Sequence, residues 1–385
     1  MDLVLLQPYL DGRGGSERVV LELARNFSPI IYTFKYEKAS TYPEFSDCDI
    51  RMLKPSGFGS LASSAASIDS DMRMSQVAAA GFTFLGVKLK DDYDVINAHL
   101  PPSEWIRNRN ERVCWYCHGP NVAFDLKLGI YNTMLHERSL FGNLLFRSGA
   151  AVYRAIELPI MKKMEKICTC SDLTKEKIAR SLGRDDAEVV YPGVEPKEFE
   201  CTGYEKFFLI SSRFVPEKRM EFAIEAFKKF NKARKWKLVI IGHLFENARN
   251  LAYFEKLKEL AQGANVSFEV NASDTKLKLL YASCYAALFS SIDEDWGIVI
   301  LEAMASSKPV ISVNKGGPTI SIKDGETGFL VNSIDEMAEK MRYLSDHPDI
   351  CEQMGKAGRK RVEQNYTWKI FLDGMEKAFK ETAKK

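Results

Sequence analysis

The chain has 385 residues, of which 45% are hydrophobic and 28% are charged, and its formal net charge is +2 at pH 7. This length favours two domains, and the near-neutral globular composition lacks the basic excess of a nucleic-acid-binding protein. No uncharged apolar run of about 18 residues occurs, and the apolar start lacks the basic region of a signal peptide. We therefore expect a cytoplasmic protein whose eight cysteines are reduced.

Short apolar runs rich in β-branched residues alternate with longer amphipathic segments along most of the chain. That alternation is typical of βαβ units around a buried parallel sheet, so the predicted fold class is α/β. In the first half, strands are expected at residues 3–7, 29–34, 93–99, 112–118, 166–171 and 187–193. The clearest helical periodicity lies over residues 17–27, where Val19, Val20 and Leu23 share one face.

Three segments of the first half fit this pattern less simply. Residues 55–80 are rich in Gly, Ser and Ala and predict a loop followed by a helix. Residues 137–166 predict a long basic helix interrupted at Pro159, which is either a solvated face or a surface lying on anionic membrane. Residues 114–118 (CWYCH) match the haem-attachment pattern C-x-x-C-H, but we interpret them as a strand that precedes a Gly-Pro turn.

The alternation restarts in the second half and predicts a second doubly wound sheet. Strands are expected at residues 207–213, 236–243, 266–270, 286–291 and 308–313, with helices at 220–233, 254–262, 277–284 and 297–306. Between the halves, the sequence YPGVEP cannot continue a helix and places a linker near residues 192–204. The predicted domains are residues 1–197 and 198–365, followed by a C-terminal helix over 366–385.

The acidic loop and helix around two glutamates form the most informative stretch. Glu294 precedes Gly297, where the following apolar run predicts a helix start, and Glu302 lies roughly 7–8 Å further along that helix. The free N–H groups of a helix N-terminus suit a diphosphate, and carboxylates on either side can accept hydrogen bonds from sugar hydroxyls. Taken singly, Glu294 could instead favour the helix dipole and Glu302 could be an exposed helix carboxylate. A carboxylate at Glu302, in a mostly buried helix, would need a partner.

Two further loops follow predicted strands of the second half. Arg213 and Lys218 emerge where open α/β sheets bind ligands, and both cations could neutralise a departing diphosphate, although an exposed basic turn is an alternative. Gly316 and Gly317 allow a close approach to a ligand, although a plain turn explains them equally well.

Together these elements resemble the large family of retaining glycosyltransferases with the GT-B fold, also described as glycosyl transferases group 1, which includes mannosyltransferases of glycan assembly. The matching features are Arg213 with its Pro-Glu-Lys turn, the E-x7-E spacing of Glu294 and Glu302, the EAMA sequence, the Gly-Gly-Pro loop and DGETGFLV at 324–331. This resemblance covers residues 205–370. Weaker matches in the first half are GGSE at 14–17, HGP at 118–120 and VVYPGV at 189–194.

The resemblance implies two Rossmann-like domains that face a cleft, with the acceptor on the N-terminal side and the nucleotide sugar on the C-terminal side. It implies that Gly15 approaches the donor phosphates, that His118 faces the transferred sugar and that Arg213 and Lys218 hold the diphosphate. It also implies that Glu294 binds the sugar and Glu302 the ribose. The whole implied set is His118, Glu294, Arg213 and Lys218 for catalysis, and Gly14, Gly15, Arg213, Lys218, Glu294, Asp295, Trp296, Gly297, Ile298 and Glu302 for donor binding.

The same resemblance implies that no metal or other cofactor is needed, since the two cations replace a metal. The best match for the donor is GDP-mannose, with UDP-sugars left open, and the implied acceptor is a glycan or a polyprenyl-linked sugar. Contact with the cytoplasmic face of a membrane is compatible with such an acceptor, and no nucleic-acid partner is expected. Two positions depart from the family pattern: Ser212 replaces a common glycine, and Ile320 replaces an acidic residue of the Gly-Gly-Pro loop.

Three other functions are considered beside this one. The first is a dinucleotide oxidoreductase, because GRGGSE at 12–17 nearly matches the dinucleotide-binding pattern G-x-G-x-x-G. Against it, Glu17 occupies the third glycine position of that pattern. A non-catalytic nucleotide-sugar-binding protein and a nucleotide-sugar epimerase could share the same scaffold. His118 also has an alternative interpretation as a hydrogen-bonded structural residue at a strand end.

Overall fold

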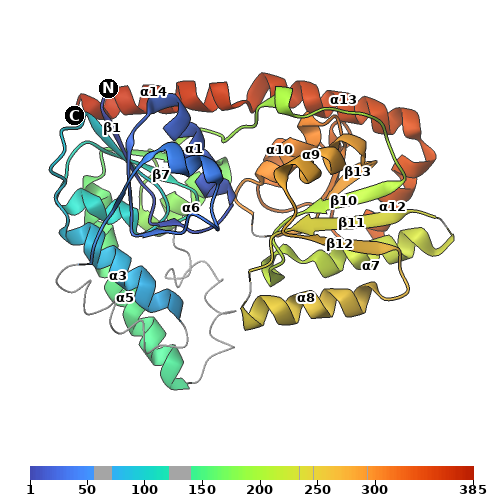
Figure 1. Cartoon of the computed structure of the whole chain (residues 1–385), viewed down its shortest axis with the longest axis horizontal. Coiled ribbons are helices and arrows are strands. Elements are labelled where there is room, and N and C mark those ends of the chain that lie inside the picture. Colours follow the sequence, from blue (N-terminus) through green and yellow to red (C-terminus); the bar gives the residue numbers. More distant parts are fainter. Residues whose placement is uncertain (56–71, 121–139, 234, 246, 293) are drawn as a thin grey trace. The chain divides into compact units, whose positions relative to one another are not determined.

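A computed structural model describes residues 1–55, 72–120, 140–233, 235–245, 247–292 and 294–385. The chain divides into two compact units (Figure 1). Unit 1 comprises Met1–Tyr191 together with Leu372–Lys385, and unit 2 comprises Pro192–Phe371. The sequence-based boundaries lay at residues 197 and 365.

Unit 1 is built on a seven-stranded parallel sheet with the order β5-β3-β1-β6-β7-β8-β9. Its strands are β1 (Leu3–Leu6), β3 (Ile30–Thr33), β5 (Asp49–Met52), β6 (Val95–Ala98), β7 (Val113–Cys117), β8 (Lys166–Thr169) and β9 (Glu188–Val189), and a separate pair consists of β2 (Tyr9–Leu10) and β4 (Lys35–Tyr36). The chain runs outward from β1 in both directions, so the order reverses between β1 and β6. Open α/β sheets bind ligands beyond the carboxyl ends of their strands at such a reversal.

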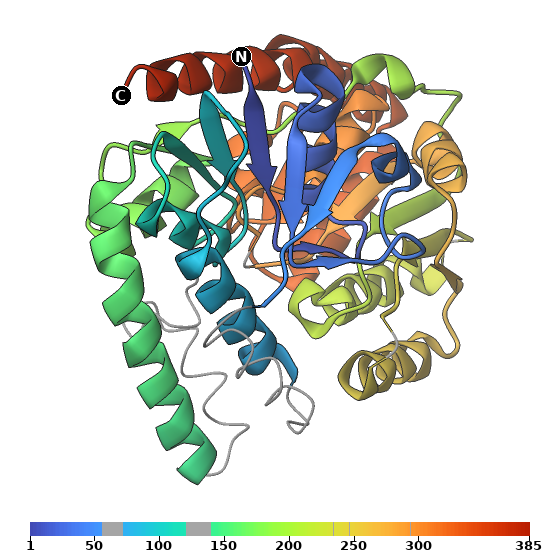
Figure 2. The same ribbon diagram turned by 60° about the vertical axis from the view of Figure 1, so that its left-hand side comes forward.

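Helices cover this sheet: α1 (Gly15–Phe27), α3 (Met72–Gly86), α5 (Leu140–Lys163) and α6 (Asp172–Leu182), with 3-10 turns at η1 (Pro43–Asp47) and η2 (Ser103–Asn108). Figure 2 shows α3 and α5 projecting from the same side of unit 1. Trp105 and Tyr153 join η2 to α5 in the buried core, with ring centroids 4.8 Å apart. Local capping fixes α6, since the Ser171 side chain accepts from the Thr174 amide and Gly183 adopts φ +66° after its last turn.

The helix α5 corrects one expectation. The sequence predicted an interruption at Pro159, but α5 continues through that residue to Lys163. Proline removes one helical hydrogen bond, a cost that the burial of Ile160 and Met161 on the following turn offsets. Residues 55–80 were predicted to form a loop followed by a helix. Of these, residues 56–71 lie outside the described residues, and the helix α3 begins at Met72.

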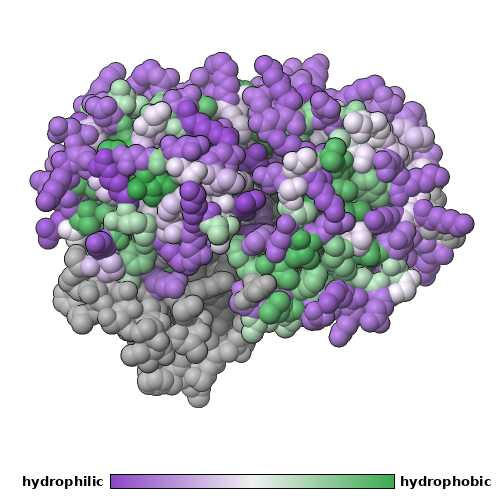
Figure 3. Space-filling view, viewed as in Figure 1, coloured by the Kyte–Doolittle hydropathy of each residue, from purple (hydrophilic) through white to green (hydrophobic). Residues whose placement is uncertain are grey.

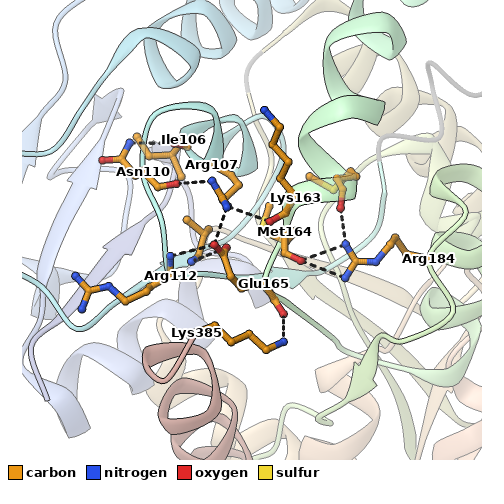
Figure 4. Close-up of polar contacts among 11 residues, drawn as sticks. Ile106, Arg107, Asn110, Arg112, Lys163, Met164, Glu165, Arg184 and Lys385 are labelled. Atoms are coloured by element: carbon orange, nitrogen blue, oxygen red, sulfur yellow. Dashed lines mark hydrogen bonds and ion pairs between the residues drawn. The ribbon is translucent and has the colours of Figure 1, made fainter.

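Cationic side chains cap the carboxyl end of α5 (Figure 4). Arg184 donates to the carbonyl oxygens of Met161 and Met164, and Arg107 donates to the Lys163 carbonyl at 3.0 Å. Arg107 is also paired with Glu165 at 2.8 Å. Because the last carbonyls of a helix have no partner within it and carry partial negative charge, these guanidinium groups stabilise the end of α5.

Unit 2 is built on a six-stranded parallel sheet with the order β12-β11-β10-β13-β14-β15. Its strands are β10 (Phe207–Ser211), β11 (Lys237–Gly242), β12 (Val266–Val270), β13 (Ala286–Phe289), β14 (Val310–Val313) and β15 (Gly328–Val331). Here the reversal lies between β10 and β13, where Leu209 pairs with Val239 on one side and with Ala287 on the other. In both units this is the doubly wound arrangement, which confirms the predicted fold class.

The helices of unit 2 are α7 (Met220–Phe230), α8 (Ala248–Ala261), α9 (Asp274–Ser283), α10 (Ile298–Ala305), α11 (Pro318–Ser321), α12 (Ile334–Asp346) and α13 (Pro348–Asn365), with 3-10 turns η4 (Pro196–Glu198), η5 (Pro216–Lys218) and η6 (Asn231–Ala233). Aromatic packing dominates one side of its core, where the Phe208 ring stacks on Trp236 with centroids 5.3 Å apart. The large buried area of such rings stabilises the packing of the sheet against α7.

The last helix, α14 (Trp368–Ala383), begins in unit 2, and its residues from Leu372 belong to unit 1. Within unit 1, the buried Phe379 ring meets Phe27 edge-on at 5.6 Å, and Glu381 is paired with Lys166 at 2.7 Å. Six of the eight cysteines are buried and all eight are free thiols. Hydrophilic side chains cover most of the face shown in Figure 3, as expected for a globular protein.

Candidate active site

The loop after β13 and the turn η5 after β10 are joined at the reversal of the unit 2 sheet. The Ser290 hydroxyl donates to the Lys218 carbonyl at 2.8 Å, and the Ser291 hydroxyl donates to the Glu217 carbonyl at 3.3 Å. Both serines are buried, so these bonds hold the two segments in a fixed relation. Because of these two bonds, the side chains of η5 lie next to those of the acidic loop that follows β13.

Lys218 and Glu294 form a direct ion pair through Nζ and Oε2. The Lys218 side chain is 14% exposed and that of Glu294 is 26% exposed, so the pair is partly shielded but open to a ligand. The sequence placed these residues in one site from two separate motifs, and the structure brings them into contact. In the absence of donor, each charge neutralises the other, and a bound diphosphate would offer Lys218 a second anionic partner.

The Gly-Gly loop packs directly against the acidic loop. The Gly317 amide donates to the Glu294 carbonyl at 2.7 Å, and a Cβ added at Gly317 would lie 2.4 Å from the Trp296 carbonyl oxygen. Gly316 adopts φ +73°, and a Cβ there would lie 2.5 Å from the Glu294 carbonyl oxygen. The close approach that two glycines permit is therefore an approach to the chain's own backbone, which fixes the position of Glu294.

The helix α10 begins at Ile298, with Gly297 as its N-cap at φ +89°. Gly297 has no side chain to cap the helix, and no side-chain cap bond is formed at this position, whereas the Ile300 amide of the first turn donates to the Gly297 carbonyl at 3.0 Å. Asp295 is half-buried in the preceding turn, whereas Asp293 lies outside the described residues. Trp296 is buried, its Nε1–H donating to the Pro192 carbonyl at 2.9 Å and its ring meeting Tyr366 at 5.2 Å. Its side chain is thus occupied within unit 2.

Glu302 lies one to two turns into α10 and is only 5% exposed. The buried Tyr281 of α9 lies beside it: burial first, and then the charge of Glu302, raise the pKa of the Tyr281 phenol well above its usual value. The same phenol donates to the Val299 carbonyl at 3.1 Å. The alternative interpretation of Glu302 as an exposed carboxylate is therefore wrong. Sequence reasoning missed Tyr281, whose place in an apolar helical run gave no signal.

Arg213 stands at the edge of this group. It follows β10, and its loop is held by two backbone bonds, from Ser212 to the Ile241 carbonyl at 3.0 Å and from Phe214 to the His243 carbonyl at 2.9 Å. Gly242 is required beside it, because a Cβ there would lie 1.8 Å from the Ser212 carbonyl oxygen. The Arg213 side chain is exposed, and the described residues form no ion pair with it. It is available to an anionic ligand.

In unit 1, His118 follows β7 and lies next to His99, which follows β6. The His99 Nδ1 and His118 Nε2 atoms are 3.1 Å apart, and the His99 Nε2 lies 2.8 Å from the Asn97 Oδ1. Burial lowers the pKa of His118 to about 3, and burial together with His118 lowers the pKa of His99 well below its usual value. Asn97 and His99 were not singled out from the sequence, although two polar residues in the otherwise apolar run VINAH were an available signal.

The first glycines lie at the N-terminus of α1. Gly14 is its N-cap in an extended conformation and Gly15 is its first residue. The Glu17 carboxylate turns back over this end, since its Oε2 lies 2.6 Å from the position of a Gly14 Cβ and accepts from Ser16 at 2.8 Å. A negative charge here stabilises the helix dipole, so a phosphate near Gly15 would have to displace it or lie beside it.

Comparison with known proteins places these features in a wider set. Residues 195–361 match the family described as glycosyl transferases group 1. The chain is 27% identical to the alpha-1,3/1,6-mannosyltransferase ALG2 of Homo sapiens over 96% of this chain and 94% of that protein. It is 24% identical to the protein of the same name from Dictyostelium discoideum, over 97% of each chain.

Solved structures share the fold over nearly the whole chain. Sucrose-phosphate synthase from Thermosynechococcus elongatus superposes with a TM-score of 0.76 at 17% identity, covering 99% of this chain and 98% of that chain. Anabaena HepE in complex with UDP and glucose superposes with a TM-score of 0.72 at 16% identity, covering 98% of each chain. At these identities the likeness shows the fold, and the predicted GT-B class is confirmed.

Proposed function

This chain belongs to the glycosyl transferases group 1 family, and we propose that it transfers mannose from GDP-mannose to a glycan or polyprenyl-linked acceptor with retention of the anomeric configuration. That it is a hexosyltransferase follows from the family. The choice of mannose is supported by relatives that are named mannosyltransferases and match over 96–97% of this chain. The single observation that carries the site is the Lys218–Glu294 pair beyond the reversal of the unit 2 sheet.

The donor contacts proposed for unit 2 follow from the chemistry of each side chain. Arg213 and Lys218 bind the diphosphate, because both side chains are cations and lie in the segment that follows β10. The free amides of α10, beginning at Ile298, add fixed donors for the same group. Glu294 accepts hydrogen bonds from the transferred sugar, and Glu302 accepts them from the ribose.

The burial of Glu302 limits its proposed contact with the ribose. With 5% of the residue exposed, only a small part of its carboxylate can meet a ribose, and Tyr281 lies beside the buried part. In unit 1, Gly15 is proposed to approach the donor phosphates and His118 the transferred sugar.

The proposed reaction needs no metal, because the charge that develops on the departing nucleoside diphosphate is met by Arg213 and Lys218. The acceptor hydroxyl attacks the anomeric carbon on the face from which the nucleoside diphosphate leaves, the bond from that carbon to the diphosphate breaks, and the hydroxyl proton passes to an oxygen of the departing diphosphate. Neutralisation of the leaving group by these two cations is the largest catalytic contribution we assign to the protein.

The proposed polyprenyl-linked acceptor raises the question of contact with a membrane. None of the helices that the structure describes is both long and apolar enough to cross a membrane. We propose that contact with a lipid-linked acceptor takes place at the cytoplasmic face of a membrane. The α5 helix carries the exposed Val152 and the exposed, basic Arg147.

The function is tested by offering the purified chain a panel of nucleotide sugars, namely GDP-mannose, UDP-glucose and UDP-GlcNAc, with glycan and polyprenyl-linked acceptors. Mass spectrometry should show a product one hexose heavier only with GDP-mannose. A product from a UDP-sugar would overturn the donor assignment but leave the transferase class. An altered nucleotide sugar without a new glycoside would instead identify an epimerase, and binding without any turnover would identify a non-catalytic protein.

A further inference from the structure

We infer that Asn97 and His99 form a hydrogen-bond relay that fixes the tautomer of His118 and leaves its Nδ1 as an acceptor for a hydroxyl of the donor sugar. This inference rests on the proposed function for the identity of the ligand. It makes Asn97 and His99 positioning residues, which act on the sugar through His118.

The direction of the relay is set at its inner end. The Asn97 Nδ2 lies 2.9 Å from the Cys114 carbonyl oxygen in the neighbouring strand β7. A carbonyl can only accept a hydrogen bond, so the amide nitrogen, and not the amide oxygen, must face Cys114. The Oδ1 of Asn97 is therefore the atom turned toward His99, and it too can only accept.

The second step follows from that oxygen. The His99 Nε2 lies 2.8 Å from the Asn97 Oδ1, so this nitrogen must carry a proton in order to donate. A neutral imidazole has one N–H and one lone pair, which leaves the His99 Nδ1 as an acceptor. His99 is fully buried, and its amide donates to the Leu6 carbonyl at 2.9 Å, so its ring is held by the fold.

The third step fixes His118. Its Nε2 lies 3.1 Å from the His99 Nδ1, and because His99 accepts there, His118 must donate. A neutral His118 then has its lone pair on Nδ1. The described residues form no hydrogen bond with that Nδ1, while the His118 carbonyl accepts from the Cys170 thiol at 3.4 Å.

Both rings are neutral in this arrangement. A proton added to the His99 Nδ1 would set N–H against N–H in the His99–His118 contact. Burial lowers the pKa of His118 to about 3, and burial together with His118 lowers the pKa of His99 well below its usual value, which agrees with two neutral rings. The ring of Tyr116 packs on both imidazoles, at 5.6 Å from His99 and 4.9 Å from His118, and brings no charge near them.

The relay determines which ligand group His118 can recognise. A bare ring nitrogen accepts from a hydroxyl and repels a phosphate oxygen, so His118 would bind the sugar part of the donor and not its diphosphate. It also means that His118 is not a proton donor near neutral pH. Since β6 adjoins the reversal of the unit 1 sheet and β7 pairs with it, the relay ends where ligands of such sheets bind.

The direct test is NMR on the full chain labelled with 15N-histidine, whose five histidines keep the spectrum simple. We expect a scalar coupling across the N–H···N bond between His118 Nε2 and His99 Nδ1, with the proton on the His118 side. Spectra of His99→Phe and His118→Phe assign the signals. A proton found on His99 Nδ1, or two protonated rings near neutral pH, would overturn the relay.

Kinetics then separate a positioning role from a merely structural one. His99→Phe should lower kcat/KM by about 10- to 100-fold, as expected for one lost hydrogen bond to the substrate, and His118→Phe should give the same loss. The double variant should lose no more than either single one, because both remove one interaction. His99→Gln, which can donate to Asn97 and accept from His118, should recover most of the activity.

The matched control is Asn110→Ala compared with Asn97→Ala. Asn110 is also buried in unit 1, and its side chain bonds Val87, Ile106 and Leu89 away from the histidines. Asn110→Ala should lose stability but keep its kcat/KM and the His99–His118 coupling. Equal kinetic losses in the two asparagine variants would show a general effect of destabilisation and contradict the relay. A wild type that shows the coupling but transfers no sugar would refute the proposed function and leave the tautomer assignment intact.

Discussion

Glu294 is the residue at which the acidic loop, the Gly-Gly loop and the turn after β10 meet. Its side chain pairs with Lys218, and its carbonyl accepts from the Gly317 amide. The backbone contact holds the residue in place independently of the carboxylate. In the proposed complex, the carboxylate would therefore exchange Lys218 for a sugar hydroxyl without disturbing the loop that carries it.

Substitution Glu294→Ala should consequently abolish transfer and leave folding intact. We expect kcat/KM to fall by at least about 100-fold. The melting temperature should change by less than about 4 °C, because a partly exposed ion pair contributes about 0–1 kcal/mol. Steady-state assays and thermal melts measure the two effects.

The control for this variant is Glu326→Ala. Glu326 is 59% exposed and pairs with Lys323 at 3.4 Å, in a different loop of unit 2. It should keep wild-type turnover. Turnover at the wild-type rate in Glu294→Ala would refute the assigned role of this carboxylate.

A buried acidic residue in unit 1 makes stability depend on pH. Glu104 in η2 is fully buried, and burial first, then the nearby Glu157, raise its pKa well above its usual value of 4.5. At a pH between the unfolded-state pKa and the folded-state pKa of Glu104, the folded state holds a proton that the unfolded state has released. Stability contributed by this group is thus present below the unfolded pKa and is lost as pH rises.

Glu104→Gln, which is neutral at every pH, should remove this dependence. As the pH rises from about 5 to about 8, the unfolding free energy of Glu104→Gln should increase relative to that of the wild type. Urea unfolding at several pH values measures it. A difference that stays constant with pH would show that Glu104 has the same pKa folded and unfolded.

At the scale of elements, most strands and helices of unit 2 were predictable, because each β-branched run became one strand of the sheet. β12 (Val266–Val270) has the predicted bounds, and α10 begins one residue after the predicted start at Gly297. In unit 1, the short edge strand β5 (Asp49–Met52) was missed, because its sequence DIRM alternates polar and apolar residues over too few positions to indicate a strand. α12 and α13 were also not predicted.

The arrangement of the candidate site was predictable where sequence motifs carry its side chains and unpredictable where contacts depend on tertiary packing. Lys218 and Glu294 come from separate motifs, and their common place beyond the strand ends follows from the doubly wound order. The continuity of α5 through Pro159 and the contact of Tyr281 with Glu302 depend on tertiary packing. Local pattern contains no information about either.

The end of α5 offers a test at this scale. Arg184 donates to the Met161 and Met164 carbonyls and pairs with Asp186 at 2.7 Å. Arg184→Ala should lower the unfolding free energy by about 1.5–3 kcal/mol, the usual value of hydrogen bonds to a charged group. Chemical denaturation measures this loss.

Arg180→Ala is the matched control. Arg180 pairs with Glu176 at 3.1 Å on the exposed face of α6, with 70% of its side chain accessible. Its loss should cost no more than about 0.5 kcal/mol. Equal effects of the two arginine variants would contradict the capping role of Arg184.

At the scale of the whole molecule, the chain returns at its C-terminus to complete the first unit. Phe379 is fully buried against Phe27, so Phe379→Ala should cost roughly 3–5 kcal/mol. Hydrogen exchange should accelerate in Met1–Tyr191 and remain unchanged in Pro192–Phe371 away from α14. The exposed Lys380→Ala, one residue on, should change neither. Uniform acceleration in both units would show that they unfold as one cooperative body.

The central claim is that the whole chain transfers mannose with retention, and the anomeric configuration of the product tests it most directly. GDP-mannose carries an α-linked sugar, so we predict an α-mannoside, identified by the one-bond carbon–proton coupling at C1 after reaction with 13C-labelled donor. Glu294→Ala should form none of it. A β-mannoside would contradict the proposed attack from the face of the leaving diphosphate, and the absence of any mannoside with every acceptor would contradict the proposed function itself.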